Sequence, residues 1–79
     1  MTKQEKIIEK LLNRPLSLKY YEIENLFNND RFQIENRKWS HKKITLNEDE
    51  EKYVIIPIHN NDCKDVYKIL LKKFYLLTK

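Results

Sequence analysis

Residues 32–58, FQIENRKWSHKKITLNEDEEKYVIIPI, carry the pattern from which the fold can be worked out. Apolar and polar residues alternate over 32–35 and again over 43–46, and residues 52–58 are strongly apolar. Such alternation, with a period of two, is typical of strands. Short polar turns connect the three segments, at residues 36–39 and 47–51. Connections this short join antiparallel strands, so the stretch predicts a three-stranded antiparallel meander.

Helical periodicity flanks this sheet on its N-terminal side. A first helix is expected to begin at a capping box formed by Thr2 and Glu5, and to end before Pro15. A second helix is expected to run from an N-cap at Ser17 to about Asn28, because apolar residues recur there at helical spacing.

A third helix is expected after residues 59–62, with Asp62 as its N-cap. Its apolar residues within one arc of about 80° should pack on the sheet: Cys63, Val66, Tyr67, Leu70, Phe74 and Leu77. Lysines occupy the opposite face: Lys64, Lys68 and Lys72. The predicted fold is therefore a single α+β domain over residues 1–79, in the order α-α-β-β-β-α. A three-stranded antiparallel sheet carries its helices on one face.

Composition excludes several classes of protein. Glycine is absent from all 79 residues, which rules out phosphate-cradling and dinucleotide-binding loops. Cys63 is the only cysteine, so neither a disulfide nor a zinc site is expected, and no other cofactor is indicated. No signal peptide is apparent, and the longest apolar run, residues 53–58, is far too short to span a membrane. We therefore expect a cytoplasmic protein without a membrane partner.

Positive charge is concentrated around the first predicted turn. The net charge is +4, and residues 36–46 contain Arg37, Lys38, Lys42 and Lys43 without an acid. Clustered cations of this kind are the electrostatic footprint of a phosphate-backbone partner. The alternative is that they only keep the protein soluble.

Strand parity places a histidine among these cations. If Ile44 and Leu46 face the helices, then His41 and Lys43 face outward. On the third strand Tyr53 faces outward by the same rule, and is the tyrosine best placed to stack on a base. His59 follows just beyond that strand.

An outward histidine among cations provides the minimum set of groups needed to cleave RNA. Imidazole can give or take a proton near neutral pH, and RNA supplies its own nucleophile, the ribose hydroxyl. Lysine and arginine can stabilise the charge that develops on the phosphate. The alternative is that His41 is an ordinary polar strand residue.

The same segment resembles the HicA family of small toxin ribonucleases from bacterial toxin–antitoxin systems. Phe32 is followed nine positions later by His41, which Ser40 precedes, as in that family's Gly-Ser-His motif. The family's Pro-x-His element is matched at residues 57–59, and a Lys-rich helix follows. The resemblance implies a fold similar to double-stranded-RNA-binding domains (dsRBDs) and metal-independent messenger RNA cleavage with His41 as the catalytic residue. It also implies an antitoxin partner of the HicB type that covers the active site.

This chain departs from the family at the glycine before Ser-His, which is Trp39 here. Glycine permits positive φ and close approach to RNA, so either the turn differs or Trp39 replaces close approach with base stacking. In the favoured hypothesis Ser40 orients His41 or the phosphate, and His59 is an accessory proton or phosphate group. The phosphate-holding cations are Arg37, Lys38, Lys42 and Lys43. The alternatives are a non-catalytic RNA-binding module and a protein-interaction domain.

Two other features are weaker candidates. Cys63 near a helix N-terminus could be an activated thiolate, although a buried structural cysteine is the commoner situation. Four adjacent acids, residues 48–51, could bind a metal, although such runs usually form a solvated loop.

Overall fold

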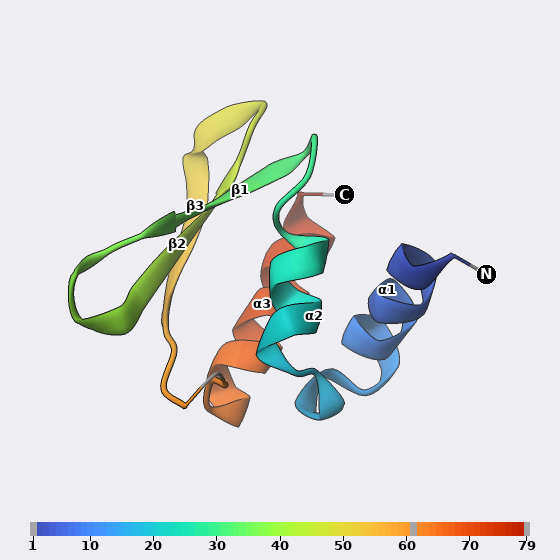
Figure 1. Cartoon of the computed structure of the whole chain (residues 1–79). Helices are drawn as coiled ribbons and strands as arrows, with labels where there is room; N and C mark the ends of the chain where they lie inside the picture. The colour runs from blue at the N-terminus through green and yellow to red at the C-terminus, as the bar shows by residue number, and fades with distance from the viewer. Residues whose placement is uncertain (1, 61, 79) are drawn as a thin grey trace.

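A computed structural model describes residues 2–60 and 62–78, and its α+β architecture is shown in Figure 1. Its elements follow in the order α1 (Lys3–Asn13), η1 (Pro15–Ser17), α2 (Tyr20–Leu26), β1 (Phe32–Asn36), η2 (Lys38–Ser40), β2 (His41–Leu46), β3 (Asp49–Pro57) and α3 (Asp65–Leu77). The strands form one antiparallel sheet in the order β1-β2-β3, as predicted. The three α-helices of the described residues lie on one side of the sheet, and α1 is the farthest from it.

Alternation along the strands separates a buried face of the sheet from an open one. Ile44 of β2 lies between Ile34 and Val54 in the register and is fully buried under the helices. Lys43, one residue earlier, points to the other face, where its partner Ile55 is exposed. The predicted parity of the strands is therefore confirmed, and His41 lies on the open face with Lys43.

The prediction of a long acidic turn is wrong. Only residues 47–48 turn, and Asp49 already begins β3. Asn47 joins this turn to the segment before β1, because its amide group donates to the carbonyl of Asp30 at 2.9 Å and its backbone N–H donates to the carbonyl of Arg31 at 2.8 Å. The surplus residues are absorbed by an irregularity in the β2–β3 register next to Leu46.

Of the capping box predicted for α1, the structure shows the Thr2 bond alone among the described residues, and the predicted cap of α2 is wrong. Thr2 Oγ1 accepts a hydrogen bond from the backbone N–H of Glu5 at 3.1 Å. Ser17 does not cap α2, since it lies in η1 and its hydroxyl donates to the carbonyl of Arg14 at 2.7 Å. The helix begins three residues later, where the Glu22 carboxylate accepts from the backbone N–H of Lys19 at 3.0 Å. It ends at Leu26, before the predicted residue 28.

Glu22 also joins α2 to α1 through a partly buried ion pair. Its carboxylate lies 3.0 Å from Lys10 Nζ, and the Glu22 residue is only 7% exposed. Burial by itself would raise the pKa of the Glu22 carboxyl, but the Lys19 amide and the Lys10 ammonium outweigh it and hold the pKa below its ordinary value of 4.5.

Acidification is therefore expected to weaken the fold through Glu22. Because the folded-state pKa is lowered, the stabilising contribution is complete above the ordinary carboxyl value and is lost as pH falls through the folded-state pKa. Denaturant unfolding across this acid range should show a smaller pH slope in Glu22→Gln than in the wild type. The variant should be less stable at neutral pH and approach the wild type in acid, whereas an unchanged slope would contradict this role.

The predicted packing face of α3 is wrong by about a quarter turn. Its buried residues are Lys68, Leu71, Phe74 and Tyr75, whereas three of the residues expected to pack on the sheet are exposed: Val66, Leu70 and Leu77. Apolar residues lie on more than one side of the helix, and it contacts η1 and α1 as well as β3. Contacts with η1 and α1 therefore determine which face of α3 is buried. A helical wheel that considers packing on the sheet alone does not reveal this.

Lys68 is the clearest consequence of this rotation. It was expected on the solvent face, yet it is 4% exposed, with its Nζ 3.3 Å from Asp62 Oδ1 and 3.3 Å from the carbonyl oxygen of Leu16. Asp62 is thus an ion-pair partner rather than the N-cap, because α3 begins only at Asp65. Partial burial would raise the pKa of Asp62, but the Cys63 amide and the Lys68 ammonium lower it overall. Asn61, in the predicted break before this helix, lies outside the described residues.

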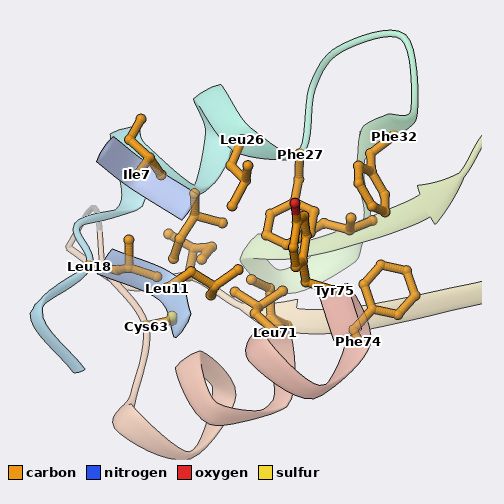
Figure 2. Packing of buried hydrophobic residues seen from close by; sticks show 14 of the residues in the cluster. Ile7, Leu11, Leu18, Leu26, Phe27, Phe32, Cys63, Leu71, Phe74 and Tyr75 are labelled. Atoms are coloured by element: carbon orange, nitrogen blue, oxygen red, sulfur yellow. The ribbon is translucent and has the colours of Figure 1, made fainter. Parts of the chain in front are cut away.

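The core fills the space between the helices and the inner sheet face (Figure 2). Aliphatic side chains from α1, η1's flank and α3 form one part of it: Ile7, Leu11, Leu18 and Leu71. Aromatic rings form the other part, where α2, β1 and α3 meet: Phe27, Phe32, Phe74 and Tyr75. The core therefore supports the sheet from its inner face, and the candidate site on the outer face contributes no residue to it.

Candidate functional site

The turn between β1 and β2 carries most of the predicted site residues. The backbone N–H of Arg37 donates to the carbonyl of His41 at 2.7 Å and closes the hairpin. The intervening residues, Lys38–Ser40, form the single turn η2. The carbonyl of Ser40 accepts a hydrogen bond from the Ile58 N–H at 3.0 Å, which extends the contact between this turn and the end of β3. The turn is therefore fixed to the sheet from both sides.

Trp39 and Ser40 have left-handed backbone conformations. Their φ angles are 63° and 66°, in the region that favours glycine. A left-handed conformation costs a bulky L-residue about 1–2 kcal/mol. The tryptophan thus has the backbone conformation that a glycine would adopt at this position, at an energetic cost. Such strain persists where the surrounding hydrogen bonds hold the turn in place.

The stability of Trp39 variants should reflect this strain. Trp39→Asn is expected to raise the free energy of unfolding by about 1 kcal/mol, because asparagine tolerates the left-handed region. In thermal unfolding, this corresponds to an increase in Tm of about 4–8 °C for a domain of this size. Trp39→Val, a matched apolar variant with a β-branched side chain, should be less stable than the wild type. If valine were tolerated as well as asparagine, strain at this position would be disproved.

The turn also orients the imidazole of His41. Nδ1 of His41 lies 2.9 Å from the carbonyl oxygen of Lys38. Because a carbonyl can only accept a hydrogen bond, Nδ1 carries the hydrogen, and in the neutral ring the lone pair is on Nε2. A backbone carbonyl therefore selects the tautomer and fixes the plane of the ring. Sequence reasoning missed this role of Lys38, since no side-chain pattern reports a backbone carbonyl.

An open hollow of about 470 Å³ surrounds the half-buried His41 on the outer sheet face. It is lined by Arg37, Lys38, Trp39, His41, Lys43, Tyr53 and Ile55. Within it the Lys43 ammonium lies 4.5 Å from the centre of the Tyr53 ring, a cation–π contact that holds the charge in place. The structure thus brings together five of the eight predicted site residues, with Tyr53 and Ile55 as apolar walls.

The other three predicted residues are placed differently. Lys42 lies on the opposite face of β2 and hydrogen-bonds to Asn36 Oδ1. Ser40 belongs to the turn, but its side chain does not line the hollow. His59 lies in a bridge with Asp62 and lines a separate hollow. The two histidines therefore belong to neighbouring sites rather than to one.

Cys63 does not have the environment of a reactive thiolate. It is 8% exposed in the core, and burial raises the pKa of its thiol above the ordinary value despite the nearby Lys68 ammonium. The prediction that Cys63 is buried is confirmed, although Cys63 precedes α3 and does not lie on the face of that helix. Among residues 2–60 and 62–78, no group of three or more His, Cys, Asp or Glu side chains is arranged to hold a metal ion.

Comparison with protein families, with curated proteins and with solved structures gives no significant match. None of the helices in the described part of the chain is both long and apolar enough to cross a membrane.

Proposed function

We propose that this protein is an endoribonuclease that cleaves RNA by acid–base catalysis at His41. The observation that carries the proposal is the orientation of the imidazole. Lys38 accepts from Nδ1 at 2.9 Å, so Nε2 is the atom that takes a proton, and the ring stands in a hollow rimmed by cations. A fixed tautomer beside fixed positive charge is the arrangement that general base catalysis at a phosphate requires.

The reaction uses the substrate's own hydroxyl as the nucleophile. Nε2 of His41 takes the proton of the ribose 2′-hydroxyl while the 2′-oxygen attacks the adjacent phosphorus. The new P–O2′ bond forms as the P–O5′ bond breaks, and the departing 5′-oxygen takes up a proton from the imidazolium or from water. The products are a 2′,3′-cyclic phosphate and a 5′-hydroxyl. Lys43, held by Tyr53, and the flanking Arg37 stabilise the negative charge on the phosphate.

The finer assignments belong to the same proposal. We place the fold with the dsRBD-like domains and the protein with HicA-type messenger RNA interferases, acting in the cytoplasm under a HicB-type antitoxin. Support comes from three helices on one face of an antiparallel meander, in the described residues, and from His41 on the open face. An antitoxin that covered this face would block the hollow directly.

Incubation of the purified protein with single-stranded RNA in the presence of a metal chelator tests the proposal. Cleavage by the wild type, and none of a DNA strand of the same sequence, is the expected result, because DNA lacks the 2′-hydroxyl. Binding that weakens steeply with salt, without cleavage, would instead identify a non-catalytic RNA-binding module. Absence of RNA binding at any salt concentration, with tight binding to an acidic protein, would identify an interaction domain and overturn the proposal.

A further inference from the structure

We propose that Trp39 is a stacking platform for one unpaired base, so that the site selects single-stranded over double-stranded RNA. This inference rests on the proposed function, because the strand it positions is the one that His41 cleaves. It adds a specificity-determining residue to a site in which Trp39 makes no chemical step.

Exposure of Trp39 is the first observation. The side chain is 85% exposed, the most exposed of the large apolar residues among those described, so it contributes little to the core. Its backbone is nevertheless held at φ 63° and ψ 37° in a turn closed by hydrogen bonds on both sides. A ring this exposed buries little apolar area that could offset the backbone strain. A ligand that covers the ring would bury that area.

Shape and charge of the hollow indicate what that ligand is. Its apolar surfaces are Trp39, Tyr53 and Ile55, the last two being 50% and 44% exposed. Its rim carries the cations Arg37, Lys38 and Lys43. Two aromatic side chains and an aliphatic one, with positive charge at the rim, complement a flat base attached to a phosphate. The volume of about 470 Å³ lies within the range of roughly 300–1,000 Å³ that small-ligand sites occupy.

Trp39 discriminates between single and double strands because the faces of a base are accessible in a single strand and covered in a duplex. In a duplex both faces of a base are covered by its neighbours, so an aromatic side chain has nothing on which to stack. In a single strand the bases can separate and stack on aromatic rings instead. His41 lies two residues after Trp39 and lines the same hollow, so a base stacked on Trp39 brings its own backbone to the imidazole.

Trp39 is the chain's only tryptophan, so its fluorescence reports on the contact directly. The probe is a short RNA of mixed sequence with 2′-O-methyl riboses, which binds but lacks the nucleophile for cleavage. The single strand should quench the emission as it binds, and the same strand annealed to its complement should not. Affinity for the labelled single strand, measured by anisotropy, should fall between about fivefold and 150-fold in Trp39→Asn, which keeps the turn. Trp39→Phe should recover much of that loss.

Several results would overturn the inference. Saturating binding of the single strand without quenching would do so, as would equal affinity in Trp39→Asn or equal quenching by the duplex. Cleavage of unmodified RNA is measured separately. If the wild type cleaves in a His41-dependent manner but Trp39→Asn binds normally, the stacking inference falls and the proposed function stands. If quenching is as expected but His41→Ala cleaves like the wild type, the proposed function falls instead.

Discussion

His41→Ala is expected to slow RNA cleavage by about 10²–10⁴-fold, the range typical for removal of a general acid or base. The loss should be in the rate and not in the fold, because His41 is half-buried on the open face and belongs to no part of the core. Circular dichroism and thermal unfolding of the variant should match the wild type. Rates should be measured with the enzyme in excess, so that product release does not mask the chemical step.

His59→Ala is the matched control for this experiment. It removes the same side chain from the second histidine, which lines a separate hollow and pairs through its backbone with Asp62. We expect a loss of at most about tenfold, as for a contact that holds the RNA without transferring a proton. If His41→Ala and His59→Ala slowed cleavage equally, the assignment of the catalytic role to His41 alone would be wrong.

Phe27→Ala is expected to lower the free energy of unfolding by about 3–5 kcal/mol, the cost of removing a large ring from a packed core. Phe27 is fully buried at the point where α2 meets β1 and α3. Its ring lies 5.0 Å from that of Phe32 in an edge-on contact and 6.2 Å from that of Phe74. Total stabilities of small domains are only about 5–15 kcal/mol, so much of this protein should be unfolded in the variant.

Tyr21→Ala is the control, since Tyr21 lies on α2, the helix that Phe27 caps at its C-terminal end, but is 64% exposed. Its effect in denaturant unfolding should stay within about 0.5 kcal/mol, as for other surface substitutions. Phe27→Leu should fall between the two, because the smaller side chain still fills part of the space. If Phe27→Ala unfolded as late as Tyr21→Ala, the aromatic part of the core would not hold the helices to the sheet.

Features with strict geometric consequences could be predicted from the sequence. A period of two assigns every strand residue to one of two faces, so the outward position of His41 and Lys43 followed once Ile44 was placed inside. The break before Pro15 and the cap at Thr2 are equally local, since each depends on residues adjacent in the chain. The structure confirms these features.

Features set by distant contacts could not be predicted in the same way. The buried face of α3 is chosen by η1 and α1, which a wheel drawn for α3 alone does not include. Lys68 is buried because Asp62 and the carbonyl of Leu16 meet it there. In the candidate site, the tautomer of His41 depends on the carbonyl of Lys38, whose position follows from the backbone of the turn rather than from any side-chain pattern.

Chemical analysis of the cleavage products tests the role of His41 most directly. Unmodified single-stranded RNA is incubated with wild type or His41→Ala in the presence of a metal chelator, and the fragment ends are identified by mass spectrometry. The wild type should leave 2′,3′-cyclic phosphate and 5′-hydroxyl ends, and the variant at the same concentration should leave about a hundredth or less of them. Ends bearing a 5′-phosphate, or equal amounts of the cyclic phosphate from the variant, would contradict acid–base catalysis by His41.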